Sequence, residues 1–315
     1  MRVVFLGTPE FAVPSLRALA ARHQVAAVLT QPDRPKGRGN ELAESPVKAA
    51  ARELDLTVHQ PERVRRAESM ELLRGLGAEL MVVVGYGQII PQAIIDLPRY
   101  GILNVHASLL PKYRGAAPIQ WAIANGETVT GVTIMQIDAG LDTGAMLLKS
   151  ALAIGPDETA PELSARLAPL GAGLLLSTID GIAGGAIHHE KQNPAEATLA
   201  PILKKEDGWV DWSRPAQQIY NRLRGFTPWP GAYTKFRGQQ FSLLRAGVAE
   251  RLDLSIGQLK AGQLKAQKRR LFACCGEGTA LELLEIQLAG KKRMTAEAFL
   301  NGYKLNDDET LGDRT

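Results

Sequence analysis

Asn104 and His106 are the first residues whose types and spacing suggest chemistry. They stand at the end of a short apolar run, residues 102–105, and one residue separates them. On an extended chain, side chains two positions apart lie on the same face. An asparagine amide can donate to a developing oxyanion, and an imidazole can give or take a proton near neutral pH. The pair is therefore a candidate for acid–base chemistry in which negative charge builds on an oxygen.

An aspartate is the third candidate for this chemistry. The glycine-rich segment of residues 137–144, which reads IDAGLDTG, offers two, Asp138 and Asp142. A carboxylate near His106 could orient the imidazole and stabilise its charged form, as the third group of a catalytic triad does. Spacing alone leaves a purely structural role open, because an N-x-H pair with a distant aspartate is also found in ordinary packing.

The scaffold for these residues is predicted by residues 1–187, in which short β-branched runs alternate with amphipathic stretches. The runs predict strands at residues 3–6, 26–30, 80–84, 102–105, 130–137 and 145–149. The stretches predict helices at residues 11–20, 46–53, 67–76, 118–124 and 161–182. This alternation is typical of an α/β fold with a Rossmann-like, doubly wound parallel sheet. Ligands of such sheets bind beyond the carboxyl ends of the strands, where Asn104 and His106 stand.

The first strand–helix turn lacks the features of a nucleotide site. It contains Gly7 alone where a dinucleotide site needs G-x-G-x-x-G, and Pro9 removes an N–H donor. No G-x-x-x-x-G-K-[ST] segment is present, which argues against a P-loop. The five histidines show no metal-ligand spacing, so we expect no metal.

A second domain follows a polar linker. Residues 188–208 are polar with weak periodicity and predict the linker. Residues 209–315 have a different texture, with short strand-like runs at 232–236, 240–246, 271–275 and 280–287. These runs predict a small β-barrel or sandwich. The adjacent Cys274 and Cys275 would point to opposite faces of a strand, so we expect packing residues in a reducing compartment.

The charge of the chain is unevenly distributed. Residues 209–306 hold 16 Lys and Arg against 7 Asp and Glu, although the whole chain carries only +4. A basic second domain favours a large anionic partner such as a nucleic acid, and a solvated basic face is the alternative. No apolar run approaches the ~18 residues of a membrane helix, so we expect a cytoplasmic protein without a membrane partner. The candidate phosphate contacts are Lys260, Lys265, Lys268, Arg269, Arg270, Lys291, Lys292 and Arg293.

Several long segments together resemble the folate-dependent formyltransferases. The segments are HASLLPKYRGAAPIQW and TGVTIMQIDAGLDTG, with FLGTPEFAVPSL, TQPDRPKGRG, PWPGAYT and AGKKRM elsewhere, so the resemblance spans nearly the whole chain. It implies that Asn104, His106 and Asp142 are the catalytic trio. It also implies an enzyme that moves a formyl group from 10-formyltetrahydrofolate to the amino group of initiator methionyl-tRNA. We expect this enzyme to be a monomer.

The resemblance assigns binding residues as well. The implied folate-site residues are Val84, Gly85, Tyr86, Gly87, Ser108, Leu109, Leu110 and Pro111. The implied tRNA contacts are Arg38, Lys204 and Lys205. Residues 209–315 are expected to form the OB-like β-barrel of the family and to bind tRNA.

Two departures and two alternatives remain. Asn40 and Glu41 stand where the family loop often has lysines, which puts the strength of that tRNA contact in doubt. The acidic tail after Lys304 differs from the basic ends of some relatives, and we expect it to be frayed. One alternative is a formyltransferase for a small amine, such as a sugar nucleotide or glycinamide ribonucleotide. The other is a non-catalytic nucleic-acid-binding protein.

Overall fold

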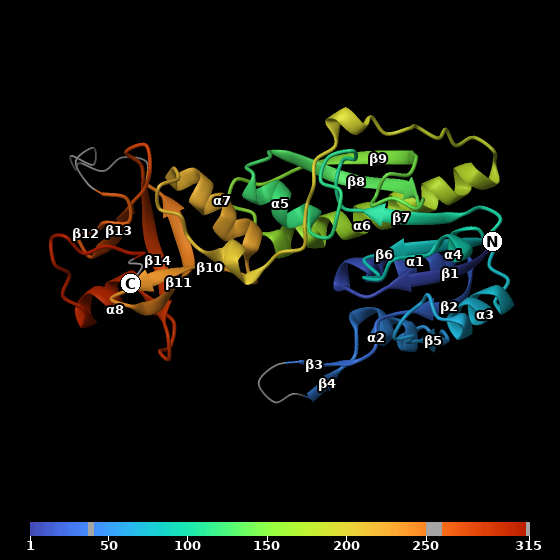
Figure 1. Cartoon of the computed structure of the whole chain (residues 1–315), viewed down its shortest axis with the longest axis horizontal. Helices are drawn as coiled ribbons and strands as arrows, with labels where there is room; N and C mark the ends of the chain where they lie inside the picture. Colours follow the sequence, from blue (N-terminus) through green and yellow to red (C-terminus); the bar gives the residue numbers. More distant parts are fainter. Residues whose placement is uncertain (37–40, 250–259, 313–315) are drawn as a thin grey trace. The chain divides into compact units, whose positions relative to one another are not determined.

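The chain forms two compact units, each described here by itself (Figure 1). The structure, a computed structural model, describes residues 1–36, 41–249 and 260–312. The first unit comprises Met1–Pro118, Val129–Ala153 and Glu162–Pro201. The second comprises Ile119–Thr128, Ile154–Pro161 and the chain from Ile202 onward. Two short internal segments thus cluster with the C-terminal unit.

A seven-stranded sheet is the framework of the first unit, with the order β5-β2-β1-β6-β7-β8-β9. Its strands are β1 (Arg2–Gly7), β2 (Gln24–Leu29), β5 (Val58–His59), β6 (Leu80–Val84), β7 (Ile102–His106), β8 (Val129–Gln136) and β9 (Met146–Ala153). The first five in this order pair in parallel, whereas β8 pairs antiparallel with both β7 and β9. The prediction of a wholly parallel sheet is therefore wrong at β8, which runs against the other six strands. β8 and β9 form a hairpin, and a hairpin can only join antiparallel strands.

Both faces of the sheet are covered by helices. Val4, Leu6 and Met81 pack on one face with Leu73 of α3 (Ala67–Gly75) and Ile94 of α4 (Gln92–Ile95). On the other face, α6 (Ala160–Ala183) brings a glycine so close to β7 and β8 that an added Cβ would lie 2.8 Å from a valine methyl of β7. The remaining helical elements before β5 are η1 (Glu10–Ala12), α1 (Val13–Arg22) and α2 (Pro46–Glu53). The doubly wound arrangement is thus present in the parallel part of the sheet.

A small hairpin of β3 (Arg34–Lys36) and β4 (Glu41–Ala43) projects from the first unit and was not predicted (Figure 1). Its base is tied down by Asp33, whose carboxylate accepts hydrogen bonds from Lys48 Nζ and Gln60 Nε2. These bonds hold the pKa of Asp33 below its usual value. The hairpin therefore starts from a fixed point on the unit.

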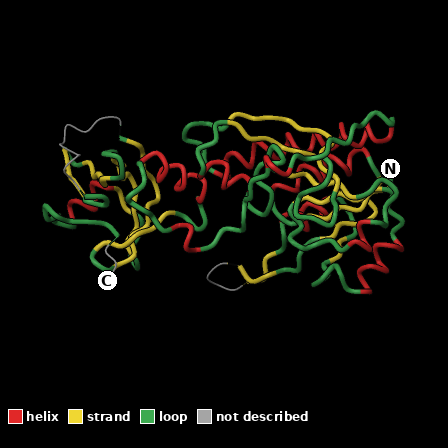
Figure 2. The backbone as a smooth tube through the Cα atoms, turned by 45° about the horizontal axis from the view of Figure 1, so that its top comes forward, coloured by secondary structure: helices red, strands yellow, loops and turns green. Residues whose placement is uncertain are grey.

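The second unit is built on a six-stranded antiparallel sheet (Figure 2). The path β10-β11-β14-β13-β12 contains β10 (Ala232–Phe236), β11 (Gln239–Val248), β14 (Ala280–Leu288), β13 (Arg270–Cys274) and β12 (Leu264–Gln267), and β15 (Met294–Thr295) pairs with β14. This path is open among the described residues, so the unit is rich in sheet without a closed barrel. The helical elements are α5 (Pro118–Ala124), η3 (Lys205–Gly208), α7 (Ala216–Phe226) and α8 (Ala296–Gly302). None of α7, α8 and β12 was predicted from the sequence.

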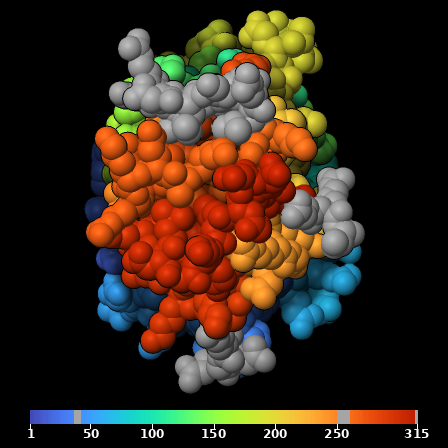
Figure 3. Space-filling view, turned by 90° about the vertical axis from the view of Figure 1, so that its left-hand side faces the viewer, coloured from blue at the N-terminus to red at the C-terminus, as the bar shows by residue number. Residues whose placement is uncertain are grey.

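The acidic tail is ordered as far as residue 312, so the prediction that it is frayed is wrong there. Thr310 makes a bridge to Gln263 next to β12, and Leu311 makes one to Phe236 at the end of β10. Leu311 is buried, and Glu309 accepts hydrogen bonds from the Arg237 guanidinium. The reason is that both outer strands offer unpaired backbone groups, which the tail satisfies while burying an apolar side chain. Figure 3 shows the surface of this unit, where the chain from β12 onward is orange to red.

Candidate active site

The carboxyl end of β7 holds two of the predicted catalytic residues. Asn104 pairs with Val83 of β6 on one side and with Met135 of β8 on the other. His106 ends the strand and is 5% exposed. The sheet therefore fixes the backbone of Asn104 on two sides and that of His106 on one, through its pairing with Thr133 of β8.

Asp142 meets them from the loop between β8 and β9. Its Oδ1 accepts a hydrogen bond from Asn104 Nδ2 at 3.3 Å, and its Oδ2 lies 3.7 Å from His106 Nδ1. The backbone N–H of Gly115 also donates to Oδ2, at 2.8 Å. Asp142 has a φ of 51°, a left-handed conformation that aspartate tolerates better than most residues. The structure thus brings Asn104, His106 and Asp142 together.

The proton positions on His106 follow from its two neighbours. Nε2 lies 2.9 Å from the backbone oxygen of Tyr113. A carbonyl oxygen can only accept, so Nε2 is the donor and carries a proton. Nδ1 is then the ring atom left for substrate, and a proton on Nδ1 would face the Asp142 carboxylate. The site can therefore hold an imidazolium that donates from Nδ1.

Hydrogen bonds shape the loop after His106, where four of the predicted folate-site residues lie. Thr133 Oγ1 donates to the backbone oxygen of Ser108 at 2.7 Å and accepts from the N–H of Leu110 at 3.1 Å. Ser108 Oγ donates to the backbone oxygen of Lys112. Ser108, Leu110 and Pro111 are buried, and Leu109 is half-buried. Leu109 is thus the one side chain of this set with open surface.

The other four predicted folate-site residues lie at the end of β6, with Val84 as its last residue and the rest in the turn that follows. Val84 and Tyr86 are buried, and Tyr86 belongs to the apolar core beneath the sheet. Burial raises the pKa of the Tyr86 phenol to about 12. Gly85 and Gly87 are exposed and have positive φ values of 57° and 81°. At this turn the backbone of the two glycines, and not the buried side chain of Tyr86 between them, can face a ligand.

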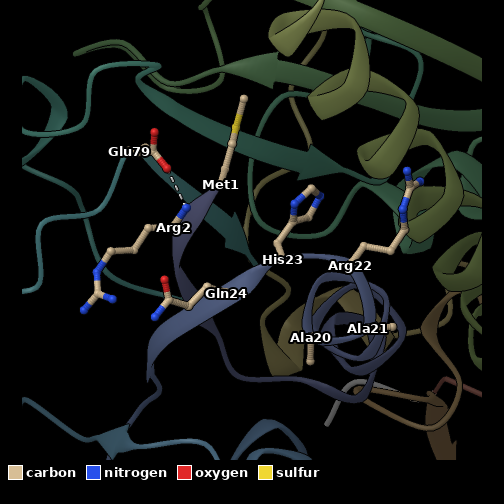
Figure 4. A pocket seen from close by; sticks show the side chains of 8 residues that line it. All are labelled: Met1, Arg2, Ala20, Ala21, Arg22, His23, Gln24 and Glu79. Atoms are coloured by element: carbon tan, nitrogen blue, oxygen red, sulfur yellow. Dashed lines mark hydrogen bonds between the residues drawn. The ribbon is translucent and has the colours of Figure 1, made fainter.

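A surface hollow of about 570 Å³ lies at the amino ends of the strands, opposite the end that holds Asn104 and His106 (Figure 4). Arg2 and Gln24, the first residues of β1 and β2, are among its lining residues, together with Glu79. It is therefore at the amino ends of the parallel strands, away from the end of β7. None of the predicted site residues lines it.

The predicted tRNA contacts are only partly described. Arg38 lies outside the described residues, and Lys204 and Lys205 are exposed. Among the candidate phosphate contacts, Arg269 pairs with Glu297 and Arg270 with Glu282. The exposed Lys268, Lys291, Lys292 and Arg293 form no ion pair with an acidic side chain of the described residues.

Three further residues support the site and were not predicted from sequence. Thr133 supports the 108–110 turn, and Arg114 and Gln192 hydrogen-bond each other beside Asp142. Thr133 and Arg114 lie inside the quoted motifs, so the motifs themselves were the available signal. Gln192 lies in the predicted linker, where nothing in the sequence distinguishes it. Within the described residues there is no group of His, Cys, Asp and Glu that could hold a metal ion, and no helix with the length and apolar character to cross a membrane.

Known proteins resemble the chain over its full length. The formyl transferase family model matches residues 1–179, and the model of the formyl transferase C-terminal domain matches residues 202–304. The methionyl-tRNA formyltransferase of Solibacter usitatus is 60% identical over 314 residues, covering 99% of each chain. The methionyl-tRNA formyltransferase of Koribacter versatilis is 57% identical over the same length and coverage.

Solved structures share the fold at low sequence identity. A sugar 3N-formyl transferase, crystallised in the presence of dTDP and 5-N-formyl-THF, has a TM-score of 0.68 at 18% identity and covers 93% of this chain and 99% of its own. An N-formyltransferase from Helicobacter canadensis, in complex with folinic acid and dTDP-3-aminofucose, has a TM-score of 0.66 at 18% identity, with coverages of 89% and 98%. The resemblance predicted from the sequence motifs is confirmed, and the chain belongs to the formyl transferase family.

Proposed function

We propose that this chain transfers a formyl group from 10-formyltetrahydrofolate to the α-amino group of initiator methionyl-tRNA. The observation that carries the proposal is the meeting of Asn104, His106 and Asp142 at the carboxyl end of β7. The choice of acceptor is supported by the full-length relatives, which are methionyl-tRNA formyltransferases. The choice of donor is supported by related structures that hold folate derivatives. The product is N-formylmethionyl-tRNA, used to start translation.

The reaction needs orientation and oxyanion stabilisation more than activation of the nucleophile. A free α-amine has a pKa of about 7.7–8.0, and an ester at the adjacent carboxyl lowers it, so much of the amine is neutral at cellular pH. As the amine attacks the formyl carbon, negative charge develops on the formyl oxygen. Asn104 Nδ2 uses one hydrogen on Asp142 and has a second for this oxygen, and a proton on His106 Nδ1 is the second donor.

Asp142 is the residue that we expect to assist the proton transfer of the reaction. A new C–N bond forms to the amine, the C–N bond to the folate breaks, and one proton passes from the amine to the departing folate nitrogen. The Asp142 carboxylate, 3.7 Å from His106 Nδ1, would stabilise the imidazolium and act as the base in this transfer. The Gly115 N–H donates a hydrogen bond to Asp142 Oδ2 and keeps the carboxylate in place.

The two substrates would be held by different parts of the chain. We place the folate against Leu109 and the exposed backbone of Gly85 and Gly87, with the buried members of the predicted set as support. We place tRNA contacts at Arg38, Lys204, Lys205 and the basic surface of a C-terminal OB-like barrel, acting mainly on phosphates. We further propose a cytoplasmic monomer.

A choice of acceptors tests the proposal. The protein is incubated with 10-formyltetrahydrofolate and either charged initiator tRNA, charged elongator methionyl-tRNA or a dTDP-3-amino sugar. The expected product is formylmethionine, recovered after the ester to tRNA is hydrolysed, from the initiator reaction only. Formylation of the sugar without formylation of the tRNA would show that the chain is instead a small-amine formyltransferase.

A further inference from the structure

Gln192 is buried, unlike the residues on either side of it in the sequence. It lies in the polar stretch after α6, where residues 188–191 and 193–196 are exposed or half-buried. Gln192 itself is only 4% exposed. Burying an amide side chain is costly unless its polar atoms are paired, so a buried glutamine in such a stretch needs partners.

The Gln192 amide has a full set of partners. Its Nε2 donates to the backbone oxygens of Asp142 and Gly144, both at 2.8 Å. Its Oε1 accepts from Arg114 Nε at 3.0 Å and from Arg114 Nη2 at 2.7 Å. Two donors and two acceptor positions are all that an amide side chain offers, so each is used.

These partners lie on the two loops that enclose the catalytic trio. On one side, Arg114 stands between Tyr113, whose carbonyl accepts from His106, and Gly115, whose N–H donates to Asp142. On the other side, Gln192 binds the carbonyl of Asp142 itself, which is held in a left-handed conformation. The segment after Gln192 also binds the Arg114 backbone. The N–H of Arg114 donates to the backbone oxygen of Thr198, and its carbonyl accepts from the N–H of Ala200.

We infer that Gln192 is a positioning residue that fixes the Asp142 carboxylate relative to Asn104 and His106. None of its atoms needs to touch substrate for this role. The Asn104–Asp142 bond of 3.3 Å and the His106–Asp142 distance of 3.7 Å are long, so small loop shifts change both. The inference rests on the proposed formyl transfer, since turnover is what it alters.

Two variants separate hydrogen bonding from packing. Gln192→Ala removes the side chain and leaves a void that can harm folding, whereas Gln192→Met keeps a similar length without the amide. Both are expected to lower kcat by roughly 10- to 100-fold, the usual scale for losing a group that orients a reacting one. The KM values for both substrates stay within about threefold, because the binding surfaces are unchanged. Gln239→Ala, which removes an exposed glutamine of β11, is the matched control and keeps wild-type turnover.

A double-variant cycle distinguishes positioning from general destabilisation. In an Asp142→Ala background, Gln192→Met is expected to lower kcat by less than about twofold further, because its target is gone. An equal loss in both backgrounds overturns the inference, and so does a Gln192→Met enzyme with wild-type kcat. Rates are normalised to the folded fraction measured by circular dichroism. A wild-type protein that formylates no methionyl-tRNA would refute the proposed function instead, so the two failures are distinct.

Discussion

Replacing Asn104 with alanine tests the proposed chemistry most directly. The change removes the Nδ2 donor from the end of β7 and leaves His106 and Asp142 in place. Removal of one oxyanion donor typically costs about 100- to 1000-fold in kcat, or about 2.7–4 kcal/mol. We expect a loss in this range for Asn104→Ala, with little change in KM.

The structure indicates that this loss should exceed any loss of stability. Asn104 is half-buried, and its side-chain hydrogen bond to Asp142 is 3.3 Å long. Such a bond is beyond the usual N–H···O range and contributes no more than about 0.5–1.5 kcal/mol to folding. The variant should therefore melt within a few degrees of the wild type while its turnover collapses.

Single-turnover formylation of charged initiator tRNA, with both substrates saturating, measures the chemical step. Asn301→Ala, which removes an exposed asparagine of α8, serves as the control and should keep full turnover. Asn104→Asp adds a contrast, because it keeps the shape but places a second carboxylate beside Asp142. Turnover of Asn104→Ala within about threefold of wild type, or a loss confined to KM, would refute the oxyanion role of Asn104.

Three other expectations concern the second unit. Arg237 holds the pKa of Glu309 below its usual value, so this pair stabilises the protein above the ordinary carboxyl range and is lost as the pH falls through the lowered pKa. Below about pH 4.5, the melting temperature of the wild type should thus fall more steeply than that of Glu309→Gln, and parallel curves would contradict this. Replacing both Lys291 and Lys292 with alanine should weaken tRNA binding, measured by filter binding. The slope of log affinity against log salt concentration should become shallower by about 0.7–0.9 for each phosphate contact that is lost. An unchanged slope would show that these lysines do not contact tRNA. The two adjacent cysteines are buried, and burial raises the pKa of both thiols, the second to about 12, so neither should react with a thiol reagent at pH 8 until the protein is unfolded.

The positions of the longer buried strands could be predicted from the sequence, but short strands such as β3, β4 and β12 and the strand directions could not. A buried strand such as β6 consists wholly of apolar residues, so its location follows from composition. Direction depends on which neighbour a strand pairs with, and β8 carries no local mark of its antiparallel pairing. The helix α7 was missed for a related reason, because its buried face includes Asn221 and Arg224. Their hydrogen bonds, which a polar sequence pattern does not reveal, make that burial possible.

The candidate site was predictable only in part. The two-residue spacing of Asn104 and His106 indicated a shared face, and motif resemblance added Asp142. Gln192 could not be found this way, since its partners lie 48 to 78 positions away in the sequence and only the fold brings them near. Two of them are backbone carbonyls, which every sequence offers equally. Residues whose side chains hydrogen-bond to backbone atoms can in general not be identified from a sequence pattern.

The placement of Thr310 and Leu311 bears on how the second unit matures during synthesis. Both residues follow all the strands in chain order, yet they cover the borders formed by β10 and β12. A nascent chain can therefore assemble the whole sheet while two rows of backbone groups still lack partners. During that interval the unit is open to pairing with other nascent chains, and the arrival of a short late segment ends the exposure.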